Sequence, residues 1–378
     1  MIALVFILSL QSANPEIVVT GKKLSEAHKI CVEQGCTPLR DAQVSIAFAE
    51  RQFRDGAYVK ARRTLEAAIA RNKDHAATDP KPVSALYEAY ATVSRHDGDL
   101  EAFKRAVGNQ VRTVRDNLPA NDPAVEGAAF AIGDMWLGLR NPQAAEIAYR
   151  SVERQALAAG NAPLALQATL RRVGLANARG DTASAERLMA EAEARPIAAD
   201  PKLRAALQVA GLRLAAGRKD DRQIDRLVKA IGRDGSTRPT LIWAPPYEPS
   251  ASAAALNTAA KFDRINPFPA RSSDLDPIQW VDIGFWIRPD GKTDEPEILR
   301  GSRSTGWAKY LLKQVSERRY TGLSSTDGDR GVYRVERFSL RGTYSTPIGS
   351  LIPRRSGAAR LEVLDLTQPD TSVAANRR

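Results

Sequence analysis

Apolar residues recur with a helical period through much of the chain before residue 232. In one stretch, Ala61, Leu65, Ala68 and Ile69 occupy positions i, i+4, i+7 and i+8, so they share one face of a helix. Segments of this kind alternate with residues that break helices. The pattern predicts helical hairpins over residues 41–232, in which small alanines let neighbouring helices approach closely.

The helix breakers recur at a nearly constant interval. They are spaced 37 to 43 residues apart and are Gly56, Gly98, Asn141-Pro142, Gly180 and Gly217. Glycine and asparagine accept the left-handed conformation that ends many helices, and proline suits the first turn of the next helix. The interval predicts an α-solenoid; the alternative interpretation is an irregular helical bundle. The units resemble tetratricopeptide repeats, although they exceed the usual length of about 34 residues and mostly lack the family's early Trp and closing Pro.

A period of two appears near the C-terminus. Val281, Ile283, Phe285 and Ile287 alternate with other residues, which predicts a strand with one apolar face. The segment Pro289–Gly291 predicts a tight turn, because proline fixes the entering angle and glycine tolerates a positive one.

The pattern then predicts a returning strand and a short helix, on which Trp307, Leu311 and Val315 share a face. A last strand follows, whose apolar residues change phase between Val335 and Phe338, so we expect a β-bulge there. The fold class is therefore α+β, with an N-terminal α-solenoid and a small C-terminal αβ domain at residues 280–366. Between the two, the proline density of residues 233–279 predicts an extended linker, within which residues 240–244 (TLIWA) form a candidate docked strand.

The order of the C-terminal elements resembles the C-terminal domain of the TonB energy-transducer family. The matching features are a strand ending in Asp-Gly (Phe285–Gly291), a Ser-x-x-x-Gly segment (Ser302–Gly306), a helix, and the exit Arg319-Tyr320. The chain has Trp307-Ala308 where the family has Leu-Asp, and it shows no membrane anchor followed by a long Pro/Lys spacer. The resemblance implies binding by strand pairing, with TonB-dependent outer-membrane receptors as candidate partners.

By the same resemblance, residues 331–340 correspond to the strand that pairs with a receptor segment. An open strand edge can pair with an extended peptide. The peptide-pairing residues expected there are Val332, Tyr333, Arg334, Val335 and Phe338. The segment Glu16–Gly21 (EIVVTG) resembles the TonB box of the receptors, which suggests pairing within or between chains; an ordinary β-prone stretch is the alternative.

The chain begins with an apolar segment, Ile2–Leu8, that is too short to span a bilayer as a helix, which needs about 20 residues. It predicts a secretory signal over residues 1–13 and hence a periplasmic protein; the alternative is a buried N-terminal strand. In the following segment, residues 14–40, Cys31 and Cys36 are the only cysteines. In an exported chain they predict a disulfide, and in a cytosolic one they would be small buried residues.

The formal charge is +11, from 55 Lys and Arg against 44 Asp and Glu. Basic and acidic residues are interspersed, so nucleic acid is not the favoured partner, although binding to nucleic acid or an anionic surface is the alternative function. His28, His75 and His96 lie far apart, and no motif indicates catalytic residues, a metal or a cofactor. We therefore expect a non-enzymatic adaptor of the cell envelope, with protein partners, no transmembrane span and a disordered tail at residues 367–378.

Overall fold

The computed structural model describes residues 21–217, 239–245, 247, 278–302, 305–322, 330–345, 349 and 354–367. The chain forms two compact units. Among the described residues, one unit ends at Leu175 and the other begins at Ala176. The predicted signal segment, most of the EIVVTG segment and nearly all of the predicted tail lie outside the described residues.

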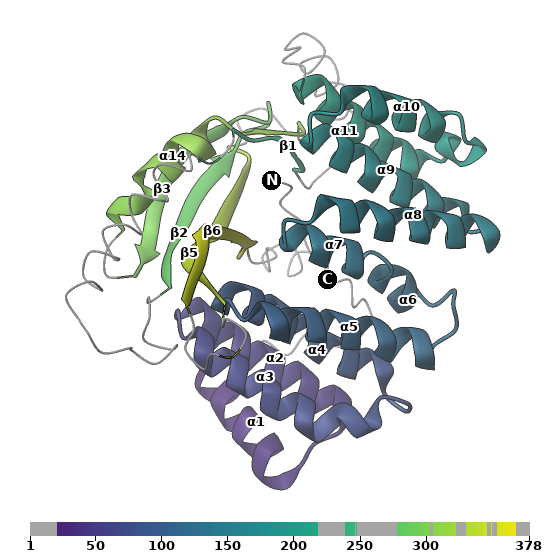
Figure 1. The fold of residues 1–378 in the computed structure, drawn as a ribbon. Helices are drawn as coiled ribbons and strands as arrows, with labels where there is room; N and C mark the ends of the chain where they lie inside the picture. The colour runs from purple at the N-terminus through teal and green to yellow at the C-terminus, as the bar shows by residue number, and fades with distance from the viewer. Residues whose placement is uncertain are drawn as a thin grey trace, which may run out of the picture. The chain divides into compact units, whose positions relative to one another are not determined.

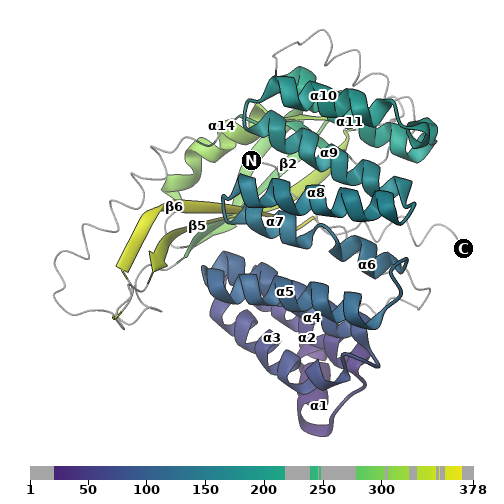
Figure 2. The same cartoon turned by 45° about the vertical axis from the view of Figure 1, so that its right-hand side comes forward.

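Helices make up the unit that ends at Leu175, and they follow one another as hairpins (Figures 1 and 2). Their bounds are α1 (Gly21–Gln34), α2 (Pro38–Arg54), α3 (Tyr58–Asn72), η1 (Lys73–His75), α4 (Pro80–Asp97), α5 (Leu100–Asn117), α6 (Pro123–Ala128), α7 (Ala131–Gly138), α8 (Pro142–Ala158) and α9 (Ala162–Ala178). Helix α2 packs on α3, α4 on α5, and α7 on α8. Because α3 and α2 also contact α4, the hairpins stack in chain order, which confirms the predicted solenoid.

Left-handed residues separate successive helices where the sequence predicts breaks, between α2 and α3, α4 and α5, α7 and α8, and α9 and α10. Gly56, Gly98 and Gly180 have φ values of 77°, 93° and 75°. At the third break the left-handed residue is Arg140, with a φ of 58°. Asn141 instead caps α8, since its side chain accepts a hydrogen bond from the Ala144 N–H at 3.0 Å.

The predicted apolar face of α3 is the buried one. Ala61, Leu65 and Ala68 are each 0% exposed, whereas Ile69 is half-buried. Alanine and leucine alternate on this face, so α3 can approach both α2 and α4 closely.

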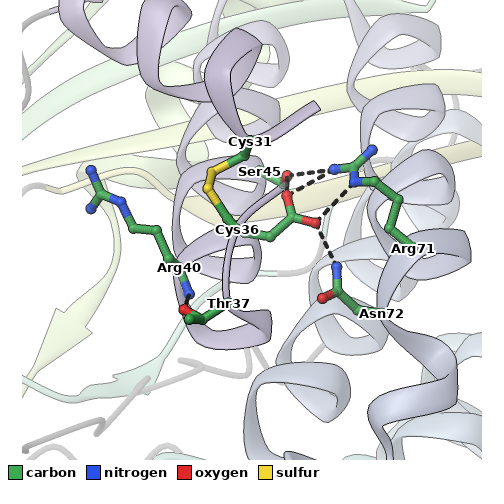
Figure 3. The surroundings of a disulfide bond; sticks show 8 residues. Cys31, Cys36, Thr37, Arg40, Ser45, Arg71 and Asn72 are labelled. Atoms are coloured by element: carbon green, nitrogen blue, oxygen red, sulfur yellow. Dashed lines mark hydrogen bonds and ion pairs between the residues drawn. A yellow bond between two sulfur atoms is a disulfide. The ribbon is translucent and has the colours of Figure 1, made fainter. Parts of the chain in front are cut away.

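Cys31 and Cys36 form the predicted disulfide (Figure 3). Cys31 lies near the end of α1 and is buried, while Cys36 lies in the short segment before α2. The next residue, Thr37, accepts a hydrogen bond from the Arg40 N–H at 3.4 Å and so caps α2. The disulfide thus fixes the end of α1 to the start of α2.

The second unit contains helices and two sheets. Its element bounds are α10 (Thr182–Glu193), η2 (Pro196–Ala199), α11 (Pro201–Gly217), β1 (Leu241–Trp243), β2 (Gln279–Ile287), β3 (Thr293–Gly301), η3 (Gly306–Ala308), α14 (Lys309–Ser316), β4 (Arg319–Tyr320), β5 (Val332–Ser345) and β6 (Arg354–Asp365). The larger sheet is antiparallel and has the order β3-β2-β5-β6. Strands β1 and β4 pair separately.

The core of the larger sheet lies between β2 and α14. Val281, Ile283, Phe285 and Ile287 are all 0% exposed, as the alternating pattern predicts. From α14, Leu311 and Val315 pack against them, and Trp307 covers the same core in part. The turn between β2 and β3 uses Gly291 at a φ of 77°, where a Cβ would collide with the Tyr320 carbonyl.

Strand β1 confirms the docked strand expected within residues 240–244. It pairs antiparallel with β4, and the Thr321 N–H donates to the Thr240 carbonyl at 2.9 Å. Ile242 of β1 also packs against Leu212 and Ala215 of α11. The segment predicted as a linker therefore holds α11 and the αβ region together, within the described part of residues 233–279.

The predicted bulge in β5 was wrong. Strand β5 pairs with β2 from Val332 to Leu340 without a register shift. The apolar pattern changes phase because Glu336 occupies an inward position, where Arg318 pairs with it. The register shifts of β5 lie against β6, between Arg341 and Tyr344.

Candidate protein-binding surfaces

The outer edge of β5 is occupied by the chain itself. Strand β6 pairs with β5 from Glu336 to Ser345, and the Leu366 N–H donates to the Val335 carbonyl at 2.8 Å. The prediction of an open pairing strand was therefore wrong for Val335 and Phe338. The physical reason is that residues 354–367 return along β5 and satisfy its backbone groups.

The remaining predicted pairing residues lie before the stretch that β6 covers. Val332, Tyr333 and Arg334 pair with β2 on the other side of β5. The Arg334 side chain donates to Asp365 at 2.8 Å, so it is tied to the end of β6. Tyr333 lies on the opposite face of the sheet from Arg334, because successive residues of a strand alternate.

A buried ion pair lies under β5. Arg318 donates to Glu336 at 2.7 Å, and the two side chains are 2% and 6% exposed. The guanidinium also donates to Gln314, Tyr320 and Tyr247, which come from α14, β4 and the segment after β1. Burial alone would lower the pKa of Arg318, but the charge of Glu336, the neighbouring Tyr320 and Tyr247 and the hydrogen bond to Glu336 together raise that pKa above its ordinary value. The pair fixes the elements around β5 and is a structural cluster that the sequence did not reveal.

The face of the sheet opposite α14 carries an aromatic cluster on β2 and β5. The rings of Trp286 and Tyr333 lie 5.1 Å apart, and the guanidinium of Arg330 lies 4.7 Å from the centre of the Trp286 ring. Both aromatic side chains are half-buried, and Leu299 of the neighbouring β3 is 45% exposed. An apolar group of this kind on a sheet surface is a candidate contact site.

In the helical unit, charged residues tie one hairpin to the next. Arg171 of α9 pairs with Asp134 of α7 at 2.6 Å, and Tyr149 of α8 donates to the same carboxylate at 2.5 Å. The Arg171 guanidinium also stacks 4.3 Å from the Phe130 ring centre. Burial raises the pKa of Asp134, and the charge of Arg171 opposes that rise.

A second set of ion pairs joins α3 to the following hairpin. Arg62 pairs with Asp97 at 2.8 Å and with Asp99 at 3.4 Å. Further along, Arg172 of α9 pairs with Glu146 and Glu153 of α8 at 2.9 and 2.5 Å. These contacts make the stacked hairpins a continuous scaffold, and sequence spacing alone did not predict them.

The three histidines lie in separate surroundings. His28 stacks on Phe48 with ring centres 4.4 Å apart, and burial lowers its pKa. His96 is 0% exposed beside Phe53, whereas His75 is exposed. Across the residues that the structure describes, no group of His, Cys, Asp and Glu is arranged to hold a metal ion. No helix in the same residues has the length and apolarity needed to cross a membrane.

No protein-family model and no curated protein matches the chain. Among solved structures, the chain is similar to the "kinesin light chain nearly identical TPR-like repeats" of Podosopora anserina, with a TM-score of 0.38 and 15% identity; the match covers 51% of this chain and 94% of that one. It is also similar to BtubC (BKLC) from P. vanneervenii, with a TM-score of 0.41 and 15% identity over 66% of this chain and 91% of that one. TM-scores and sequence identities this low support no statement about function.

Proposed function

We propose that the protein is a non-enzymatic scaffold of the cell envelope that holds partner proteins. The observation that carries this proposal is the run of hairpins tied together by ion pairs such as Arg62–Asp97 and Arg171–Asp134. Side chains fixed in this way form an extended surface, and α-solenoids bind proteins on such surfaces. Binding would then require little reordering of the scaffold, which lowers the entropic cost of association.

Two features support a place in the envelope. The disulfide between Cys31 and Cys36 is of a kind that persists in oxidising compartments. The apolar start of the chain has the composition of an export signal. Cell fractionation and sequencing of the mature N-terminus test this part: we expect a periplasmic protein that begins near residue 14, and an uncleaved cytosolic protein would contradict it.

The order β2, β3, α14, β5 supports the TonB-like character of the αβ region, and with it TonB-dependent receptors as partners. Because β6 lies along β5, a receptor segment would reach β5 by displacing β6. Ser339 and Glu362 face each other across these strands. A disulfide formed between Ser339→Cys and Glu362→Cys should block capture of the receptor, and reduction should restore it. Capture that is equally strong in the locked form would exclude displacement.

The decisive experiment is crosslinking of the full chain in the envelope fraction, followed by identification of the captured proteins. Reversing the charge that joins two hairpins, with Arg62→Glu, should reduce capture, whereas Arg187→Glu on the exposed face of α10 serves as the matched control. If no protein is enriched, or if Arg62→Glu reduces capture no more than Arg187→Glu does, the scaffold proposal fails.

The salt dependence of capture distinguishes protein binding from the alternative, which is binding to nucleic acid or to an anionic surface. Binding to phosphates weakens steeply as salt rises, because counterions are released on association. We expect capture of protein partners to persist at salt concentrations that abolish retention on an anionic resin. Capture that falls in parallel with that retention would favour the alternative.

A further inference from the structure

The outer face of the larger sheet carries a partly exposed aromatic group that the proposed function leaves unused. We name Trp286, Tyr333 and Leu299 the outer-face patch. They lie on β2, β5 and β3, on the side opposite α14, with Gly284 between them. Trp and Tyr supply much of the contact energy at protein interfaces, since they bury large areas at low entropic cost.

Gly284 forms the floor of this patch. A Cβ at Gly284 would collide with the Tyr333 hydroxyl and lie 3.1 Å from the Leu299 side chain. The absence of a side chain therefore lets Tyr333 lie across β2, with its hydroxyl 3.5 Å from the Glu297 carboxylate. The position of the Tyr333 ring in the patch therefore depends on glycine at position 284.

The rim of the patch on β3 is acidic. Asp294, Glu295 and Glu297 are exposed there, in a chain whose net charge is +11. Asp294 pairs with Trp286 across β2 and β3, and Glu297 pairs with Gly284. This local charge is opposite to that of the whole chain, so it is complementary to a cationic partner.

Arg330 shows how a cation sits on the patch. Its guanidinium lies 4.7 Å from the Trp286 ring centre and pairs with Glu295. The Arg330 and Glu295 side chains are 59% and 61% exposed, so the pair is worth little in water and can be exchanged. A second guanidinium could therefore take the place of Arg330 with the same contacts.

The edge of β3 is poorly suited to strand addition. Pro296 has no N–H to donate, Glu295 has a φ of 47°, and the register of β3 against β2 shifts twice. A partner at this site would therefore be bound through side chains that contact the patch.

We propose that the outer-face patch binds an arginine-bearing segment of a partner protein. The incoming guanidinium stacks on Trp286 in place of Arg330, and the carboxylates of Glu295 and Glu297 pair with it. This inference deepens the proposed scaffold function by naming the chemistry of one partner. It does not depend on displacement of β6.

The test uses the full chain and a fluorescein-labelled peptide of alternating arginine and glycine, with binding followed by fluorescence anisotropy. Trp286→Ala should weaken binding about tenfold, as expected for an aromatic anchor. Arg330→Ala should strengthen it about threefold, because the competing cation is removed. Glu191→Gln, on α10, is the matched control and should leave binding unchanged.

Either of two results with the variants would overturn the inference. One is binding that Trp286→Ala leaves unchanged; the other is binding that Arg330→Ala leaves unchanged or weakens. A lysine–glycine peptide should bind more weakly than the arginine peptide, and equal binding would exclude stacking. Thermal unfolding of each variant verifies that it is folded.

The result is separable from that of the scaffold experiment. If the peptide fails to bind while envelope crosslinking still captures partners, this inference fails and the scaffold proposal stands. If the peptide binds as expected but nothing is captured in the envelope, the scaffold proposal fails.

Discussion

At the scale of single residues, close approaches decide what each position tolerates. Gly133 of α7 faces the ring of Tyr149, and a Cβ there would lie inside contact distance of three ring atoms. Tyr149 cannot swing away freely, because its hydroxyl donates to Asp134 and its ring lies 6.4 Å from Phe130. Gly133 is therefore required by packing, with no unusual backbone angle involved.

We expect Gly133→Ala to destabilise the helical unit by about 1–3 kcal/mol, the usual cost of overpacking a well-packed core. Chemical denaturation followed by circular dichroism measures this change. Gly108→Ala on α5 is the matched control, because a Cβ there meets nothing within 4 Å. The control should be neutral or stabilising by up to about 1 kcal/mol, and equal effects at both positions would contradict the packing argument.

Asp41 illustrates a charge held by several donors, and Figure 3 labels three of them, Ser45, Arg71 and Asn72. Arg71 donates to its carboxylate at 2.9 and 2.8 Å, Asn72 at 2.6 Å and Ser45 at 2.9 Å. Burial alone would raise the pKa of Asp41, but these hydrogen bonds outweigh it and hold the pKa below 3.8. The folded state thus binds the proton less readily than the unfolded state does.

It follows that Asp41 contributes stability above pH 3.8, and that this contribution is lost as the pH falls through the lower folded-state pKa. We expect amide exchange of α2 and α3 to accelerate as the pH falls below 3.8, beyond the intrinsic pH dependence. Asp41→Asn should remove this acid-dependent part. A variant with the same acid response as the parent chain would show that other groups are responsible.

At the scale of elements, local signals were predictable and non-local pairing was not. The glycines that end α2 and α4 could be identified because a left-handed turn is specified by one residue. The edge of β5 could not be judged, because the strand that covers it, β6, begins nine residues after β5 ends and shows no clean apolar alternation. Nothing in the sequence indicated that Arg318 and Glu336 would meet, 18 residues apart, in the core.

The disulfide has a definite role for α1. Within the described helices, α1 packs on α2, and its buried apolar residues are Leu24 and Cys31. Ile30 and Val32 beside the disulfide are each 48% exposed, so packing alone holds this end weakly. The disulfide therefore holds this end of α1 in place, which the small packed area alone does only weakly.

Reduction of Cys31–Cys36 should therefore release α1 while leaving the later hairpins intact. We expect faster amide exchange in α1. The free energy that holds α1 against α2 should fall by about 2 kcal/mol, the stabilisation expected when a disulfide closes a short loop. Mass spectrometry with and without dithiothreitol measures both. The double variant Cys31→Ser, Cys36→Ser should behave like the reduced protein and ignore the reductant; α1 that stays protected after reduction would contradict this role.

At the scale of the whole molecule, part of the positive charge of the described residues is engaged in local ion pairs. Basic residues of the hairpins pair with acidic ones, as Arg62, Arg171 and Arg172 do. The net charge of +11 is the difference between 55 Lys and Arg and 44 Asp and Glu, so it is small beside the number of charged groups. We expect weak retention on heparin that disappears at moderate salt, and tight retention at high salt would indicate a dedicated anionic partner.

The position of β6 bears on how the chain acquires its structure. In a polypeptide synthesised from its N-terminus, β5 leaves the ribosome before residues 354–365 do, and until β6 pairs with it β5 has one margin whose amides and carbonyls are unsatisfied. For that interval the new chain can pair with other copies. A gene cut short before codon 354 would make that exposure permanent, and its product should accumulate as aggregates.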